Sequence, residues 1–289
     1  NKEVIFDMQF EKDAGQFGMS NQWYTRFRSF NGYMVGYDLY EQFYSSNGLS
    51  INDPGNTLYD STIRPTGIKS PSTYVKQGGY DNRFTNRDPR LHYTLVVPYS
   101  IRDYNPATGD PVVSYPSQQQ SANFTGFRVR KYVDYSDNGV QNISGVNPVI
   151  IRYADVLLME AEALVESGTY NEAEVYSLIN QVRQRPSVKM PRVQDVEGTG
   201  LSPEALINVI RHERRVEFAF EGLRIFDVIR WNIGAQAYRD LRGYRPGKLT
   251  PNSISYEVYA ALARSFNASK GYRWPVPKSE LDANKGIGQ

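Results

Sequence analysis

Three glutamates recur at helical spacing in the stretch RHERRVEFAFEGLRIFDVIRW (211–231), and they are the residues best suited to chemistry. They are Glu213, Glu217 and Glu221, with five arginines around them: Arg211, Arg214, Arg215, Arg224 and Arg230. Two carboxylates one helical turn apart are of the type that glycosidases use as an acid–base pair. Carboxylates among arginines are equally the components of a buried ion network with no catalytic role. The phase of the helix that carries them separates the two alternatives.

The helix begins clearly at Leu201-Ser202-Pro203-Glu204, where the serine can act as N-cap and the proline stands at the first helical position. We predict a helix over 203–220, with Gly222 near its C-terminal end. At 100° per residue, Glu213 and Glu217 fall inside the apolar stripe formed by Leu206, Ile210 and Phe220. Buried carboxylates require partners, and guanidinium groups lower the pKa that a general acid needs to have raised. The sequence therefore predicts a structural ion network comprising Glu213, Glu217, Arg214, Arg224 and Arg230, and no catalytic residue.

Other common chemistries are excluded by composition. The chain has no cysteine and only two histidines, His92 and His212. His212-Glu213 begins like a zinc-protease motif, but Val216 stands where the second histidine is required. We therefore expect no metal site and no cofactor. The net charge of +2, with both signs interspersed, gives no reason to expect nucleic acid as a partner.

The chain divides into two regions by pattern. Residues 1–147 are rich in aromatic residues and in turn-forming Gly, Pro, Asn and Ser, as in NDPGN (52–56) and YNPATGDP (104–111). We expect a loop-rich, ligand-facing region with a few short elements. The expected strands are 4–10, 92–98 and 127–133, and one short helix is expected at 38–46.

Residues 148–289 have a helical pattern. Helices are expected over 152–167 and 170–185, separated by Gly168-Thr169, and this pair resembles one tetratricopeptide unit. After the helix at 203–220 we expect another over 226–237. The tail YRWPVPKSEL (272–281) reads as an extended segment followed by a last helical turn. The two regions are expected to form one globular unit.

Several motifs together resemble the SusD/RagB family. They are IIRYADVLLMEAEAL (150–164), INQVRQR (179–185), IRHERRVEFAFEGLRIFDVIRW (210–231) and WPVPKSEL (274–281), with EVIF (3–6) and NRDPRLHYTLVVP (86–98) upstream. Their order and spacing also match, so the resemblance covers nearly the whole chain.

The resemblance implies a mainly α fold of SusD type, in which tetratricopeptide-like helices support a loop-rich ligand face. It also implies a bacterial surface lipoprotein of Bacteroidetes that binds oligosaccharide or polysaccharide without cleaving it. Such proteins deliver the glycan to a TonB-dependent outer-membrane transporter. The family's N-terminal tetratricopeptide units and lipidated cysteine are not among these residues. We therefore interpret the chain as part of a longer protein, attached to the membrane only through a lipid anchor outside this part.

A glycan is held by aromatic rings and by amide or guanidinium donors on loops. The stretch FGMSNQWYTRFRSFNGYMVGYDLY (17–40) has the densest supply of both. The predicted glycan-binding residues are Trp23, Tyr24, Asn21, Arg26, Asn31 and Tyr33, a placement that the resemblance also favours. Alternatively, the aromatic residues of this stretch, with Met34, are the core-facing stripe of a helix.

Two other functions stay open at the level of sequence. One is a peptide- or protein-binding component of a similar uptake complex, since some relatives in the family handle peptides. The other is a glycoside hydrolase that uses Glu213 and Glu217, which the arginine-rich surroundings disfavour.

Overall fold

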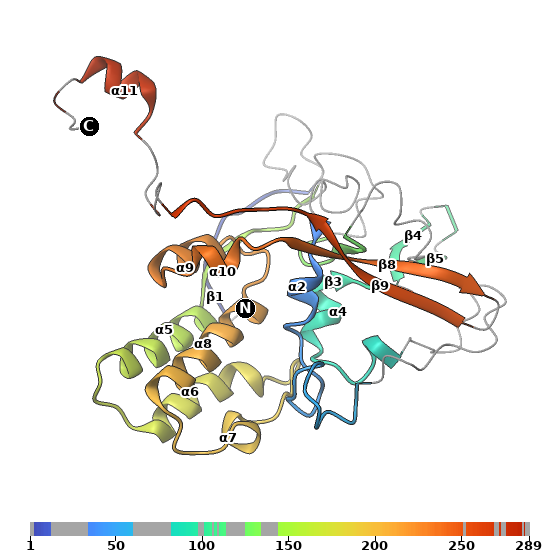
Figure 1. The fold of residues 1–289 in the computed structure, drawn as a ribbon, viewed down its shortest axis with the longest axis horizontal. Helices are drawn as coiled ribbons and strands as arrows, with labels where there is room; N and C mark the ends of the chain where they lie inside the picture. Colours follow the sequence, from blue (N-terminus) through green and yellow to red (C-terminus); the bar gives the residue numbers. More distant parts are fainter. Residues whose placement is uncertain are drawn as a thin grey trace.

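The computed structural model describes residues 3–12, 34–59, 82–97, 101–105, 107–108, 110–113, 125–133, 144–250, 253–268, 272, 276–284 and 286. Within them, a group of packed helices lies to one side and short strands with a long hairpin lie to the other (Figure 1). Two hydrophobic cores correspond to these two parts.

The helical part begins with an antiparallel pair, α5 (Tyr153–Glu166) and α6 (Glu172–Arg183). The turn between them contains Gly168 at φ +74°, a conformation that suits glycine. Asn171 caps α6, because its side chain accepts a hydrogen bond from the Ala173 amide at 2.9 Å. Both predicted helices are thus confirmed, the first shorter by one residue at each end and the second by two residues at each end.

The helix that carries the glutamates is α8 (Pro203–Glu217), which packs beside α5 and near the short α7 (Val193–Val196) (Figure 1). Its start is as predicted, since the Ser202 hydroxyl accepts from the Ala205 amide at 3.2 Å. Its end is three residues earlier than expected, because the chain leaves the helix through Phe220 at φ +64°. The core here includes Leu158, Ile179, Leu206, Ile210 and Phe218.

The second core lies around a three-stranded antiparallel sheet in the order β2 (Met34–Val35), β6 (Phe127–Val129), β3 (Leu95–Val96). The short helices α2 (Tyr37–Tyr40), η2 (Asn82–Phe84) and α4 (Arg90–Thr94) contribute to it. Aromatic rings fill the interior: Tyr40 stacks on Phe127 at 4.9 Å between centroids, and Phe127 stacks on Tyr244 at 5.5 Å. Val216 of α8 also belongs to this core, so α8 joins the two.

Two expectations for this region are wrong in type or length. A strand is predicted at 92–98, but His92 lies in α4, and of the described residues 92–97 only Leu95–Val96 forms a strand. The helix forms because the Asp88 carboxylate accepts from the Arg90 amide at 2.9 Å and so satisfies its first turn. The helix expected at 38–46 is reduced to α2, and the chain then turns at Gly48 with φ +86°.

The first residues form β1 (Val4–Asp7), which pairs antiparallel with β7 (Val149–Arg152) directly before α5. The strand predicted at 4–10 is therefore shorter than expected, and so is the one at 127–133, which ends after Val129. Tyr132, at φ +64°, adopts the left-handed conformation in that segment.

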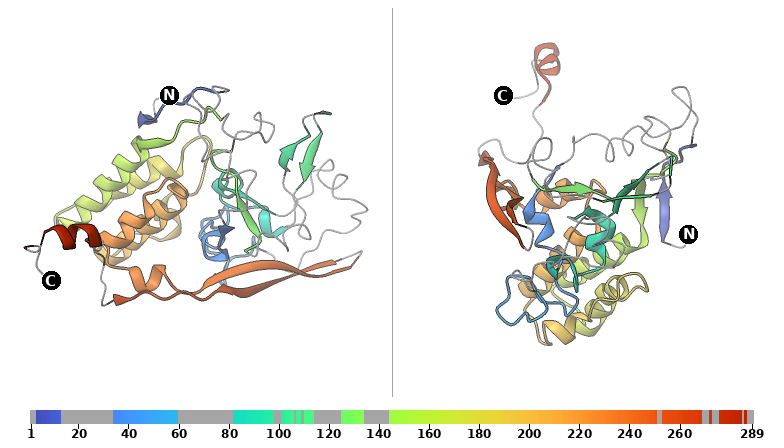
Figure 2. Two further views of the ribbon diagram at one scale, coloured as in Figure 1. Left: turned by 90° about the horizontal axis from the view of Figure 1, so that it is seen from above. Right: turned by 90° about the vertical axis from the view of Figure 1, so that its right-hand side faces the viewer.

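A long hairpin that the sequence pattern does not predict follows the helices. Its strands are β8 (Leu241–Thr250) and β9 (Ser253–Leu262), and it runs along the whole strand-containing side of the molecule (Figures 1 and 2). A separate small antiparallel pair is formed by β4 (Ile101–Tyr104) and β5 (Pro111–Val113), and Figure 2 shows it apart from the hairpin. The region 148–289 is thus not only helical.

The helix predicted at 226–237 is two helices, α9 (Arg224–Arg230) and α10 (Gly234–Ala237), divided at Asn232 with φ +56°. The predicted last helical turn is present as α11 (Lys278–Ala283). This helix buries no side chain and stands apart from the other helices (Figures 1 and 2).

Candidate functional site

Glu213 and Glu217 lie in the interior, as the phase of α8 requires. Their relative exposures are 1% and 4%, similar to those of the apolar residues Leu206 and Ile210 on the same helix face. Neither carboxylate is presented to a solvent-filled cleft. A substrate would have to displace packed side chains to reach them.

The two carboxylates are paired with arginines from elsewhere in the chain. The Arg90 Nη1 atom lies 2.5 Å from Glu213 and 2.9 Å from Glu217. The other oxygen of Glu217 receives Arg152 at 2.6 Å and Arg185 at 2.7 Å. These arginines belong to α4, to the last residue of β7 and to the segment after α6, so the pairs join three separate segments to α8.

The same cluster completes the C-terminal end of α8. The Glu217 backbone carbonyl accepts from Lys131 Nζ at 2.9 Å and from Arg152 Nη2 at 3.0 Å. Cations at this end of a helix donate hydrogen bonds to its free carbonyls and interact favourably with the negative end of its dipole. Glu221, just beyond the helix, then pairs with Arg152 at 2.7 Å and also with Lys131.

These surroundings determine the acidity of Glu217. Burial alone would raise the pKa of its carboxyl group, but the guanidinium groups of Arg90, Arg152 and Arg185 outweigh burial and hold the pKa well below its usual range. A carboxylate in this state neither donates a proton near neutral pH nor accepts one readily. Glu217 is therefore poorly suited to acid–base catalysis.

The arginines nearest in sequence do not pair with Glu213 and Glu217, contrary to our expectation. Arg214 pairs instead with Asp155 at 2.7 Å and with Asp227 at 3.1 Å. Arg230 pairs with the same Asp227 at 2.9 Å and with Glu162 at 2.5 Å. A second ion network thus links α5, α8 and α9, beside the one around Glu217.

Arg224 lies in neither network. Within the ranges that the structure describes, it forms no ion pair, and its guanidinium lies over the ring of Trp231 at 5.8 Å from the centroid. The expectation that Arg224 belongs to the network with Glu213 and Glu217 is therefore wrong. Arg224 and Trp231 lie on the same side of α9, because they are seven residues, or about two helical turns, apart.

The partners of Glu217 are not identifiable from the sequence. Arg90, Arg152 and Arg185 are spread over almost 100 residues and share no local motif. The one feature of the sequence that could have drawn attention to Arg90 is the charged segment NRDPR (86–90), which directly precedes an apolar run. Only the tertiary fold brings these guanidinium groups together.

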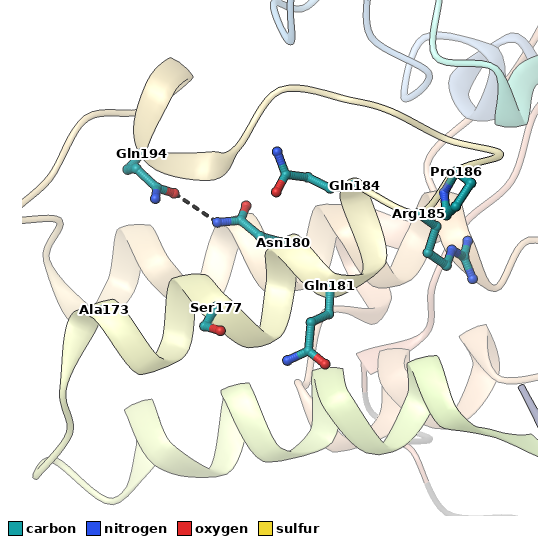
Figure 3. Close-up of a pocket in the computed structure, with 8 residues that line it drawn as sticks. All are labelled: Ala173, Ser177, Asn180, Gln181, Gln184, Arg185, Pro186 and Gln194. Atoms are coloured by element: carbon teal, nitrogen blue, oxygen red, sulfur yellow. Dashed lines mark hydrogen bonds between the residues drawn. The ribbon is translucent and has the colours of Figure 1, made fainter. Parts of the chain in front are cut away.

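An open pocket of about 550 Å³ lies on the outer side of α6 (Figure 3). Uncharged polar side chains dominate its lining: Ser177, Asn180, Gln181, Gln184 and Gln194, with Ala173, Arg185 and Pro186. Asn180 donates to Gln194 at 2.9 Å, and its own oxygen accepts from the Val193 amide at 2.9 Å. The Asn180 amide is thereby satisfied within the protein, whereas the buried Nε of Arg185 has no hydrogen-bond partner among the described residues.

The predicted glycan-binding residues, Asn21, Trp23, Tyr24, Arg26, Asn31 and Tyr33, lie outside the described residues. The alternative, that the aromatic residues of 17–40 form the core-facing stripe of a helix, is testable only from residue 34 onward. Met34 lies in strand β2, and Tyr37 starts helix α2 with its ring stacked on Tyr244 at 5.2 Å. Those two residues are therefore not part of one continuous helix.

Metal and membrane signals are weak in the described ranges. No group of three or more histidine or acidic side chains there could hold a metal ion. No helix there combines the length and the apolar composition that crossing a bilayer would require.

The chain belongs to the SusD family, since that family's model matches residues 2–289. Its fold is accordingly the mainly α fold of SusD-like proteins. The chain is 30% identical to the SusD-like protein P2 of Formosa agariphila, and the match covers 99% of this chain and 52% of that protein.

Two solved structures from Bacteroides fragilis are also similar. One is a SusD-like protein, with a TM-score of 0.70 and 27% identity over 99% of this chain and 53% of that one. The other is a SusD-like carbohydrate-binding protein, with a TM-score of 0.69 and 26% identity over 100% of this chain and 55% of that one. The chain thus spans about half the length of the relatives it matches.

Proposed function

We propose that the protein binds an oligosaccharide or polysaccharide at the bacterial cell surface and does not cleave it. The observation that carries the proposal is membership of the SusD family along residues 2–289, together with similarity to a carbohydrate-binding member of that family. The state of the glutamates supports the absence of catalysis, because Glu213 and Glu217 are buried and paired with arginines.

The glycan-binding residues in this proposal remain Asn21, Trp23, Tyr24, Arg26, Asn31 and Tyr33. Their types suit the task. Aromatic rings stack on the C–H faces of a sugar, whereas amide and guanidinium groups bind its hydroxyls. The pocket on α6 is a weaker candidate, because no aromatic side chain lines it.

In the same proposal the protein acts with a TonB-dependent transporter in the outer membrane. It reaches the membrane through a lipid anchor outside this chain and hands the glycan to the transporter. Co-expression of the full-length protein with a candidate TonB-dependent transporter from the same organism, followed by affinity purification, should recover both in a stable ratio. Recovery of the protein alone under mild detergent would contradict this part.

The binding proposal is tested by affinity electrophoresis of the purified protein through gels that contain single polysaccharides. At least one polysaccharide should retard the protein, and the same sample should release no reducing sugar. Binding of peptides with no retardation by any glycan would favour a peptide-binding component instead. Reducing-sugar release that is lost in a Glu217→Gln variant shown to be folded would establish a glycoside hydrolase and refute the proposal.

A further inference from the structure

Three arginines of α8 and α9 have no carboxylate partner among the residues that the structure describes. They are Arg211, Arg215 and Arg224, all partly buried. Arg215 makes one long contact, from Nη2 to the Asp38 carbonyl oxygen at 3.4 Å. The Nε atom of Arg211 is buried without a hydrogen-bond partner. The other two arginines of α8 and α9, Arg214 and Arg230, both form ion pairs with carboxylates.

The three side chains are neighbours. Arg211 and Arg215 are one helical turn apart on the same face of α8, an arrangement that is unfavourable for like charges. Arg211 and Arg224 both lie over the Trp231 ring, at 5.0 and 5.8 Å from its centroid. We refer to Arg211, Arg215 and Arg224 as the arginine cluster.

Nearby acids do not neutralise the arginine cluster, because other arginines already occupy them. Asp38 receives Arg242 at 2.5 Å and Arg239 at 3.0 Å. Asp227 receives Arg214 and Arg230, as described above. This part of the surface therefore carries an excess of positive charge.

The electrostatics reflect that excess. Burial, together with the charges of Arg224 and Arg239, lowers the pKa of Arg215 to about 10, against the opposing effects of Asp38 and Glu41. Burial and the charge of Arg211 also lower the pKa of Arg224, against the opposing effect of Asp227. A partly desolvated guanidinium without a counter-charge is unfavourable, and such groups tend to mark functional sites.

We propose that the arginine cluster binds the oxyanion group of an acidic saccharide, a carboxylate or a sulfate ester. A planar guanidinium offers paired donors that match the oxygen spacing of such groups. Trp231 holds two of the three guanidinium groups in place, so less side-chain freedom is lost when the anion binds. The inference rests on the proposed glycan-binding function and narrows its substrate class to acidic glycans.

The test is isothermal titration of the purified protein with charged and neutral forms of one oligosaccharide. The probes are oligogalacturonate with its fully methyl-esterified form, and a sulfated galactan oligosaccharide with its desulfated form. At least one charged form should bind about tenfold more tightly than its neutral form, in the range expected for charge-assisted hydrogen bonds. Which charged form binds distinguishes a carboxylate from a sulfate ligand.

Arg215→Met should remove most of this preference and leave the neutral forms unaffected. It should not lower the melting temperature, because it removes an unpaired charge rather than a partnered one. Arg192→Gln is the matched control for net charge, since Arg192 is exposed and pairs with Asp195. It should retain the full preference for the charged form.

Two results would overturn the inference. One is equal binding of charged and neutral forms, which would leave glycan binding itself intact. The other is an Arg215→Met variant that melts at a clearly lower temperature and keeps the full charge preference, which would make the arginine structural. Failure of every glycan to bind would instead contradict the proposed function.

Discussion

Arg90 and Glu217 are 127 residues apart in sequence, yet the Arg90 Nη1 atom lies 2.9 Å from the Glu217 carboxylate. The pair connects α4, which belongs to the aromatic core, with α8, which belongs to the helical core. Because both side chains are buried, water does not screen the interaction strongly. The ion network therefore holds the two parts of the fold together.

Replacing Glu217 should destabilise the protein strongly. Glu217→Gln leaves the buried charges of Arg90 and Arg152 short of a partner, a change that costs about 3–5 kcal/mol in comparable sites. Urea denaturation measures the free energy of unfolding. The matched control is Glu160→Gln, on the exposed side of α5, which should change it by less than about 0.5 kcal/mol. An equally stable Glu217→Gln variant would show that the network does not support the fold.

Stability should fall as the pH drops below about 6.5. Burial lowers the pKa of His212, whose Nε2 atom lies 2.8 Å from the Gln42 carbonyl oxygen, and burial likewise lowers that of His92. Below their usual pKa of 6.5, the unfolded chain binds protons that the folded chain does not, so unfolding becomes more favourable. Urea denaturation from pH 8 to pH 5 measures the slope, and His212→Gln should make it shallower.

A second loss of stability should appear at lower pH. The pKa of Glu217 is depressed in the folded state, so its contribution is complete above the usual value of 4.5 and is lost as the pH falls below it. The Glu217→Gln variant should lack this component. If wild type and variant had the same pH profile below 4.5, the carboxylate would not be stabilised by its arginines.

Gly126 should not tolerate a side chain. It has φ +86°, and a Cβ atom there would lie 1.7 Å from the Tyr244 carbonyl oxygen of β8. Gly126→Ala should lower the free energy of unfolding by about 3 kcal/mol or more, because strain in the backbone adds to a clash in a packed core.

Gly198 is the matched control, since it has φ +84° with open space around it. Gly198→Ala should cost only about 1–2 kcal/mol, the penalty of the left-handed conformation. Equal melting temperatures for the two variants would contradict the close approach of β6 and β8.

The helices of the second half are predictable because their determinants are local. Ser202 and Pro203 define the start of α8, and apolar spacing defines its buried face. The buried position of Glu217 follows from that spacing alone. The end of α8 is not predictable in this way, because Phe220 adopts a left-handed conformation that favours glycine or asparagine.

The hairpin β8–β9 and the partners of Glu217 depend on contacts distant in sequence. Pro246 and Gly247 within β8 normally argue against a strand, and pairing with β9 overrides them. Helix α4 likewise depends on Asp88, whose carboxylate accepts a hydrogen bond from the Arg90 amide and also pairs with the Arg90 side chain at 2.7 Å. Arg152 and Arg185 lie within ion-pair distance of Glu217 only because α5, α6 and α8 pack together.

The central claim is that the protein binds glycan through aromatic residues upstream of the helical core. It is tested most directly by isothermal titration of wild type, Trp23→Ala and Tyr93→Ala with the polysaccharide that best retards the protein in a gel. Tyr93 is the control, as an aromatic residue that is 62% exposed on α4. The Trp23→Ala variant should bind the polysaccharide about tenfold more weakly than wild type, or weaker still, because it loses an aromatic stacking contact. Tyr93→Ala should bind as wild type does. Wild-type affinity in a folded Trp23→Ala variant would contradict the claim.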